Sequence, residues 1–122
     1  MSTLLSGESI IDVVMDYRQY FVPYASEINN FLAQFFASKI KESKKITSTA
    51  SGMWKKLEDF IAGGKRIRGG LVKLGYECFR KVEEDKILPV SAAIEVTQGA
   101  ILIHDDIIDQ ADLRHNRPTV HR

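Results

Sequence analysis

A chain of 122 residues, 44% of them hydrophobic and 27% charged, is long enough for one small domain with a modest core. Its formal net charge of +1 excludes a global field that draws the chain to nucleic acid or to an anionic membrane, so any anion must be bound by a local cluster. A single cysteine, Cys78, excludes an intrachain disulfide, and its amphipathic surroundings predict a small buried hydrophobic side chain rather than a catalytic thiol. We expect a cytoplasmic chain without a signal peptide or a transmembrane segment, because no apolar run is read as long enough to span a membrane.

The first part of the chain is predicted to form two helices and a loop. Apolar residues recur every three or four positions over 10–24, and this helix is expected to break at Pro23. Ser26 is expected to cap a second helix over 26–43. The apolar face of that helix comprises Ile28, Leu32, Phe35, Phe36 and Ile40. Residues 41–52 are charged and then small and polar, which predicts a loop.

Three more helices are predicted in the rest of the chain. A short helix over 53–64 is expected to end at its two final glycines, and a longer one is expected over 71–86. Pro89 and Ser91 are expected to open the last helix, over 91–114. No stretch alternates cleanly between apolar and polar residues. The expected fold class is therefore all-α, an antiparallel helix bundle with short connections.

The last predicted helix carries a narrow stripe of polar side chains. At about 100° per residue, Asp105 and Asp109 fall within about 20° of Gln98 around the helix axis, whereas Asp106 falls on the flank. Apolar residues surround the stripe, so we expect this helix to be mostly buried. Two neighbouring carboxylates on a buried helix repel each other and are costly to desolvate, which calls for a compensating charge.

A hard cation would supply that charge. Mg²⁺ prefers oxygen ligands and usually binds one or two carboxylates together with substrate phosphates. Asp105 and Asp109 are therefore predicted to hold Mg²⁺ and, through it, a diphosphate. The alternative is a solvent-exposed acidic helix end, with Arg114 or Arg117 as its ionic partner.

A second cluster, GGKRIRGG over 63–70, is basic and rich in glycine. Glycines free the backbone so that its N–H groups can face an anion, and Lys65 and Arg68 point the same way if they share a helical turn. A helix start near Leu71 would add a partial positive charge. We interpret the segment as a phosphate site. Nucleic-acid binding is the competing interpretation, which the short patch and the absence of interleaved aromatic residues disfavour.

Together, the two clusters resemble those of the trans-isoprenyl diphosphate synthases, the polyprenyl synthetase family. AGGKRIR resembles the family segment GGKRxR, DDIID resembles the first aspartate-rich motif DDxxD, and LRHNRPT resembles the following RRGxPT. Gln98 stands where the family places a Gln or His that contacts isopentenyl diphosphate. The resemblance extends over 53–122, and the helices before residue 53 agree with it only in pattern.

The resemblance implies the head-to-tail addition of isopentenyl diphosphate to an allylic diphosphate by a Mg²⁺-dependent, homodimeric enzyme of the isoprenoid synthase fold. It implies that Asp105 and Asp109 are metal ligands and that Asp106 is a flanking carboxylate outside the metal's ligand sphere. Arg114 matches an arginine that contacts the allylic diphosphate. The residues implied to bind isopentenyl diphosphate are Gly64, Lys65, Arg68, Gln98 and, in place of the family's second arginine, His115. Lys65, Asp105 and Asp109 are the implied catalytic residues.

The chain departs from the family pattern at three positions. His115 donates fewer hydrogen bonds than the arginine that is common there and is largely neutral at pH 7; Arg117 is the candidate to compensate. Asn116 replaces a glycine, and Gly69 replaces a proline. The family's second aspartate-rich motif is also absent from the 122 residues, which we interpret as the N-terminal part of a single polyprenyl synthetase domain that is inactive by itself.

Two further expectations concern product and class. In the family, residues one turn before the first aspartate motif form the floor of the tail-binding cavity. Ala100 and Ile101 stand there, and neither is aromatic, so products of geranylgeranyl length or longer are expected unless a residue elsewhere sets the floor. A non-catalytic helical subunit of a prenyl synthase is the alternative function. A class I terpene cyclase is disfavoured because cyclases lack the GGKRxR site.

Overall fold

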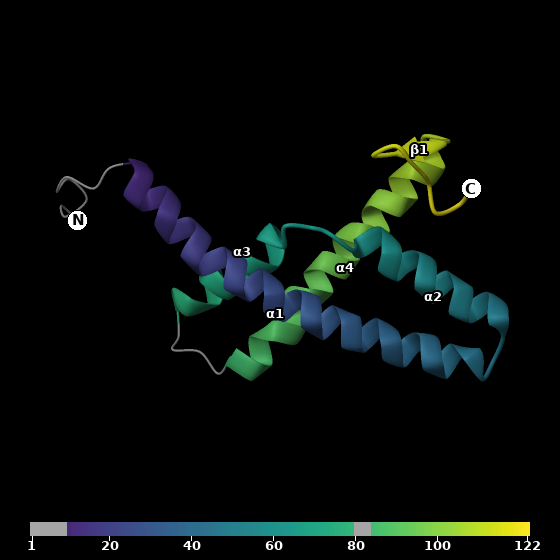
Figure 1. Cartoon of the computed structure of the whole chain (residues 1–122), viewed down its shortest axis with the longest axis horizontal. Coiled ribbons are helices and arrows are strands. Elements are labelled where there is room, and N and C mark those ends of the chain that lie inside the picture. Colours follow the sequence, from purple (N-terminus) through teal and green to yellow (C-terminus); the bar gives the residue numbers. More distant parts are fainter. Residues whose placement is uncertain (1–9, 80–83) are drawn as a thin grey trace.

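The computed structural model describes residues 10–79 and 84–122, and within them the chain is predominantly helical, which confirms the all-α fold class. The elements, in chain order, are α1 (Ile10–Lys44), α2 (Ser48–Ile61), α3 (Ile67–Glu77), α4 (Glu84–Ile108), β1 (Leu113–Arg114) and β2 (Arg117–Pro118). The long helix α1 runs through most of the molecule, and α2 folds back beside its C-terminal half (Figure 1). α4 crosses α1 and also contacts α2 and α3, so it is the central helix of the bundle.

The core lies mainly on one face of α1. Tyr24, Ile28, Leu32 and Phe36 are all buried and recur every four residues, which keeps them on one side of a helix. They pack with Ile61 of α2 and Ala92 of α4. The predicted apolar face of the segment 26–43 is thus confirmed at Ile28, Leu32 and Phe36. The Tyr24 hydroxyl donates to the buried Ser91 hydroxyl at 2.8 Å, which satisfies two polar groups inside the contact between α1 and α4.

The predicted break at Pro23 is wrong, because α1 continues through Pro23 as one helix. Ser26 consequently lies inside the helix and is not its N-cap. A proline in a helix interior costs one backbone hydrogen bond and about 3 kcal/mol. The core stripe that begins at Tyr24 needs the same helix on both sides of the proline, and burial of large side chains, each contributing about 1.5–3 kcal/mol, outweighs that cost.

The connections on either side of α2 are shorter than predicted. Residues 41–52 were expected to form a loop, but α1 extends to Lys44 and α2 begins at Ser48. Thr47 marks the start of α2, since its side chain accepts a hydrogen bond from the backbone N–H of Ala50 at 3.0 Å. The end of α2 at Ile61, before the two glycines, is as predicted. α3 begins at Ile67 rather than near Leu71, four residues earlier than expected.

The last helix is displaced from its predicted bounds at both ends. α4 begins at Glu84, so Pro89 lies inside it rather than at its start, and it ends at Ile108 rather than at residue 114. The remaining residues form an antiparallel hairpin in which Arg114 pairs with Arg117. We had expected no strand. Strands of two residues are too short to show the alternating pattern by which a sequence reveals a strand.

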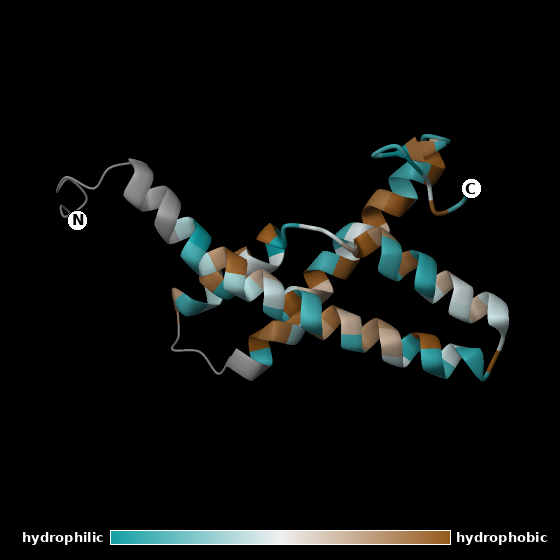
Figure 2. Ribbon diagram, viewed as in Figure 1, coloured by the Kyte–Doolittle hydropathy of each residue, from teal (hydrophilic) through white to brown (hydrophobic). Residues whose placement is uncertain are grey.

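Two burial predictions are also wrong. Cys78 is exposed, because α3 ends at Glu77 and the cysteine follows as its cap. α4 is not mostly buried. Its apolar residues continue along its length (Figure 2), and one side of the helix leaves large aliphatic side chains in solvent. These exposed side chains are Val90, Ile94, Ile101, Ile107 and Ile108.

One helix in the described part of the chain, over Lys86–Ile108, is long and apolar enough to cross a membrane by those two measures alone. This finding differs from the expectation that no apolar run has that length. A core helix of a soluble protein satisfies the same two measures, and α4 packs against three other helices.

Candidate functional site

The hairpin after α4 is built on a turn with an unusual backbone. His115 and Asn116, the two residues between β1 and β2, both have positive φ angles, of 49° and 61°. Two successive residues in this region define a type I′ turn, whose twist matches that of a two-stranded hairpin. Asparagine tolerates this conformation better than other residues that have a side chain, which explains how Asn116 stands in place of a glycine. The turn brings His115 to the tip of the hairpin.

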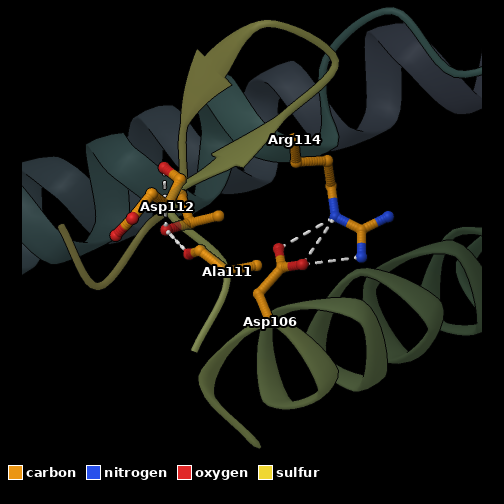
Figure 3. Close-up of polar contacts among 5 residues, drawn as sticks. Asp106, Ala111, Asp112 and Arg114 are labelled. Carbon is orange, nitrogen blue, oxygen red and sulfur yellow. Dashed lines mark hydrogen bonds and ion pairs between the residues drawn. The ribbon is translucent and has the colours of Figure 1, made fainter. Parts of the chain in front are cut away.

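A bidentate ion pair joins this hairpin to the helix before it. The Arg114 Nε and Nη2 atoms donate to both carboxylate oxygens of Asp106 at 2.7–3.0 Å (Figure 3). Asp106 is buried although its two acidic neighbours are exposed. The hydrogen bonds from Arg114 lower the pKa of Asp106 and raise that of Arg114. The third guanidinium nitrogen, Nη1, makes no hydrogen bond to any described residue, so one edge of Arg114 is held while the other stays available.

The other strand of the hairpin is held by a buried threonine. The Thr119 hydroxyl donates to the Ala111 carbonyl at 2.7 Å, and the Thr119 backbone N–H donates to the Asp112 carbonyl at 3.0 Å. Thr119 is one of the few buried polar residues in the described chain. The hairpin is therefore attached to α4 through Arg114 and to the segment after α4 through Thr119, and it forms a defined wall.

The basic segment between α2 and α3 forms the opposite wall. Gly63 has a φ angle of 81°, which favours glycine and turns the chain out of α2. Lys65 and Arg68 are exposed, but they do not share a helical turn, because Arg66 between them adopts a left-handed conformation and α3 begins only at Ile67. Their predicted orientation by helical spacing is therefore wrong, although both side chains still line the same cavity.

Gly69 and Gly70 do not serve the role expected of them. Both are buried within α3, where a Cβ atom at Gly69 would lie 2.6 Å from Ile28 Cδ1 and one at Gly70 would lie 2.4 Å from Phe21 Cδ1. These glycines let α3 approach α1 closely, rather than exposing backbone N–H groups to an anion. The Gly69 N–H is in fact occupied, since it donates to the Glu95 carboxylate at 2.8 Å.

One cavity of about 850 Å³ lies between these walls and α4. It brings together residues from three separate parts of the sequence: the turn after α2, the middle of α4, and the hairpin. Every residue expected to bind substrate lines it: Gly64, Lys65, Arg68, Gln98, Arg114 and His115. The cavity also contains Arg117, the candidate to compensate for His115. Lys65, Arg68 and Arg117 make no ion pair with any described residue, so their charges are available to an anion.

The two predicted metal ligands lie beyond the edge of this cavity. Asp105 and Asp109 are exposed, one helical turn apart, with the Asp109 N–H donating to the Asp105 carbonyl at 2.9 Å. Neither carboxylate is paired with a cation among the described residues, whereas Asp106 is fully engaged by Arg114. The described chain contains no cluster of three metal-binding side chains. Two free carboxylates suit Mg²⁺, which completes its coordination with water and phosphate oxygens.

The two residues expected to form the floor of a tail cavity, Ala100 and Ile101, are exposed on α4 and do not line the cavity. By helical geometry Ile101 lies about 40° around the axis from Asp105, whereas Ala100 lies about 140° away. Ile94 lies about 20° from Asp105 and is also exposed. Two exposed aliphatic residues, Ile94 and Ile101, therefore lie on the stripe of α4 that leads away from Asp105, together with the polar Gln98, whereas Ala100 lies off it.

Sequence reasoning overlooked two residues of the cavity wall. Arg66, the middle basic residue of the cluster, is buried and bonds to Asn29 of α1 and Glu95 of α4. Its pKa is lowered by burial, an effect that the nearby Glu95 carboxylate opposes. The signal that was available was Glu95 itself, a lone acid three residues before Gln98 in an otherwise apolar stretch. Its partner was not evident from the sequence, because they are separated by 29 residues.

The site and fold agree with the comparison to known families. The sequence profile of the polyprenyl synthetases matches residues 53–122, which is more than half of the chain and includes every residue of the cavity. The chain therefore belongs to the polyprenyl synthetase family, the class of trans-isoprenyl diphosphate synthases. No solved structure matches the chain.

Several curated relatives support this assignment. The chain is 47% identical over 61 residues to a short chain isoprenyl diphosphate synthase of Methanocaldococcus jannaschii, a match that covers 50% of this chain and 18% of the relative. It is 34% identical over 102 residues to a geranylgeranyl diphosphate synthase of Sulfolobus acidocaldarius, covering 84% of this chain and 29% of the relative.

It is also 32% identical over 128 aligned positions to geranylgeranyl pyrophosphate synthase 7, chloroplastic, of Arabidopsis thaliana, covering 100% of this chain and 34% of the relative. The matches thus span between 18% and 34% of the length of these three relatives.

Proposed function

We propose that this chain carries the isopentenyl diphosphate site and half of the metal site of a prenyltransferase that condenses isopentenyl diphosphate with an allylic diphosphate. One observation carries the proposal: a single cavity gathers Lys65, Arg68, Gln98 and Arg114 from three distant segments, and its cations outnumber its acids. A chain with a net charge of only +1 has concentrated positive charge at this place. A diphosphate matches both the charge and the hydrogen-bond donors of the cavity.

The residues divide between two diphosphates. Lys65 and Arg68 hold the diphosphate of isopentenyl diphosphate, with the Gln98 amide as an additional donor. Arg114 presents its free Nη1 edge to the allylic diphosphate while Asp106 holds the opposite edge. In the reaction, the C–O bond of the allylic diphosphate breaks, a new C–C bond forms to the double bond of isopentenyl diphosphate, and a proton is lost. The cations stabilise the negative charge that develops on the departing diphosphate.

Asp105 and Asp109 are the residues that would hold Mg²⁺. When bound, the metal acts as a Lewis acid on the leaving diphosphate. The protein contributes two carboxylates on one helical turn, close to Arg114, and keeps Asp106 out of the ligand set by pairing it with that arginine. We therefore expect turnover to depend on Asp105 and Asp109 more strongly than on Asp106.

Binding to this chain is the direct test. Isothermal titration calorimetry should detect isopentenyl diphosphate, and Lys65→Met or Arg68→Met should each weaken its binding by roughly tenfold or more, the effect of one charge-assisted hydrogen bond of about 1.5–3 kcal/mol. Lys41→Met is the matched control: it removes one exposed positive charge from α1, and Lys41 does not line the cavity. Equal weakening by the control would mean that net charge, and not this cavity, determines binding.

The proposal also predicts what this chain does not catalyse by itself. We expect this chain to bind isopentenyl diphosphate without elongating an allylic diphosphate, because the family's second aspartate-rich motif is not in its sequence. Formation of longer product from radiolabelled isopentenyl diphosphate by the purified chain would refute this expectation. If the chain shows no binding and no turnover, that result would favour the alternative of a non-catalytic helical subunit.

The exposed stripe on α4 supports a long product. From Ile94 to Asp105 it extends about 16 Å at 1.5 Å per residue, and it contains no aromatic side chain that would block a growing chain. We propose products of geranylgeranyl length or longer. In a protein that contains this chain and turns over, Ile101→Phe should shorten the product, and Ala100→Phe should do so less, since Ala100 faces away from Asp105. Unchanged products in both variants would place the floor elsewhere.

A further inference from the structure

Arg66 differs from the two basic residues beside it. Lys65 and Arg68 are exposed, whereas only 6% of the Arg66 surface is accessible to solvent. Its backbone is left-handed, with φ 56° and ψ 31°, a conformation that residues with a side chain adopt only where surrounding contacts impose it. A solvated arginine in a flexible turn would have neither property. Specific contacts with other parts of the chain must therefore hold Arg66.

The Arg66 guanidinium connects two helices. Its Nε donates to the Asn29 side-chain oxygen on α1 at 2.7 Å, and its Nη1 lies 3.7 Å from a carboxylate oxygen of Glu95 on α4. The other Glu95 oxygen accepts a hydrogen bond from the Gly69 N–H at the start of α3, at 2.8 Å. The turn between α2 and α3 is thus attached at its centre to α1 and α4, and α3 is attached directly to α4.

The neighbouring glycine is shaped to this arrangement. A Cβ atom at Gly64 would lie 2.9 Å from Arg66 Nη1 and 3.4 Å from Arg66 Cζ, so the guanidinium lies against the bare backbone of Gly64. Gly64 needs no positive φ angle, and its small size is what the structure uses. The side chain of Arg66 therefore lies back over its own loop and forms part of the cavity wall.

The charge of Glu95 links these contacts to the binding of an anion. Its carboxylate lines the same cavity as Lys65 and Arg68, and a bare carboxylate there would repel a diphosphate. With one oxygen on a backbone N–H and the other facing Arg66, its charge is already balanced. The cations that remain for a ligand are the exposed ones.

We propose that Asn29, Arg66 and Glu95 form a clamp that positions Lys65 and Arg68 for an anionic ligand, and that Arg66 acts as a positioning residue and not as a ligand-binding one. The ligand part of this inference rests on the proposed function. The clamp itself rests only on the contacts within the chain.

Asn29 is the residue by which to test the clamp, because it lies on α1, does not line the cavity and reaches it only through Arg66. Asn29→Ala removes the hydrogen bond to Arg66 Nε. The matched control is Asn30→Ala, which makes the same substitution one position further along, at an exposed residue whose side chain makes no hydrogen bond to the described residues. Both variants should be compared as the full 122-residue chain.

Two measurements separate the clamp from its ligand. Hydrogen–deuterium exchange should show faster exchange across residues 63–70 in Asn29→Ala and not in Asn30→Ala. Calorimetry with inorganic pyrophosphate at 25 °C should show about tenfold weaker binding in Asn29→Ala, and unchanged binding in the control. Thermal denaturation of both variants establishes that the protein is folded at the temperature of titration. A loss of affinity then cannot be caused by unfolding.

The outcomes are distinct. Unchanged exchange over 63–70 in Asn29→Ala overturns the clamp whatever the ligand does. Faster exchange with unchanged pyrophosphate affinity overturns the positioning role, because the turn would then bind the anion without the clamp. Faster exchange in a chain whose wild type does not bind pyrophosphate supports the clamp and refutes the proposed diphosphate site instead.

Discussion

Gly69 offers a quantitative test of how α3 is held, because proline is the residue that the family pattern leads one to expect there. In this chain Gly69 is the third residue of α3, and its N–H donates to Glu95 at 2.8 Å. Proline is tolerated in the first turn of a helix, where N–H groups lack intrahelical partners. Here, however, that N–H has a partner, so the substitution Gly69→Pro removes a bond that the glycine makes.

The size of the effect follows from three contributions. Losing a hydrogen bond to a charged carboxylate costs about 1.5–3 kcal/mol. The added side chain would place a Cβ atom 2.6 Å from Ile28 Cδ1 and 3.0 Å from the Ser91 carbonyl oxygen, and such overpacking costs about 1–3 kcal/mol. Proline also restricts the unfolded chain, which stabilises the folded state by only about 0.4–1 kcal/mol. Gly69→Pro should therefore destabilise the chain by about 1.5–5.5 kcal/mol.

Urea denaturation followed by circular dichroism measures this difference, and Gly69→Ala is the control. Alanine introduces the same Cβ atom but keeps the N–H, and its higher helix propensity returns up to about 1 kcal/mol. The alanine variant should therefore lose clearly less stability than the proline variant. If the two variants are equally stable, the hydrogen bond to Glu95 contributes nothing. If proline is as stable as the wild-type glycine, the close contact with Ile28 is also refuted.

Three other substitutions test separate features of the structure. Pro23→Ala should raise the stability of the chain by about 1–3 kcal/mol in the same denaturation assay, because α1 continues through this exposed position; no gain would mean that the helix breaks there. Because hydrogen bonds from Arg114 lower the pKa of Asp106, the pair stabilises the fold above about pH 4 and this contribution is lost as the pH falls. The difference in Tm between wild type and Asp106→Asn should therefore be present at pH 7 and shrink below pH 4, and a difference that is independent of pH would contradict the ion pair. His115→Arg should tighten isopentenyl diphosphate binding in calorimetry by on the order of 1–3 kcal/mol, whereas unchanged affinity would indicate that Arg117 already supplies the second arginine.

The sequence predicts which side chains line the same cavity better than it predicts the local structure that presents them. Lys65 and Arg68 were correctly expected near Gln98, although the expected shared helical turn does not exist. Family motifs record which side chains must meet, and several backbone routes satisfy that requirement. The αL conformation of Arg66 leaves no trace in residue type, because it is imposed by partners on α1 and α4 rather than by local preference.

The two errors at proline residues share one cause. Rules for proline describe the cost to an isolated helix, and at both Pro23 and Pro89 that cost is real but smaller than the gain from packing the helix on both sides. The predictions for glycine were wrong for a different reason. Gly69 and Gly70 were assigned backbone freedom, whereas the structure uses their lack of a side chain for contact between α3 and α1.

Charge pairing within the cavity separates the cations that hold its walls from those left for the proposed diphosphate ligand. Several cations around the cavity are already paired: Arg66 with Glu95, Arg114 with Asp106, and Arg122 with Asp112. The first pair attaches the turn before α3 and the second attaches the hairpin, whereas the third is an exposed pair beside the hairpin. Lys65, Arg68 and Arg117 are among the cavity's cations that have no carboxylate partner in the described residues. Several positive charges gathered around one cavity favour a small, highly charged ligand over an extended polyanion, which needs a long basic surface.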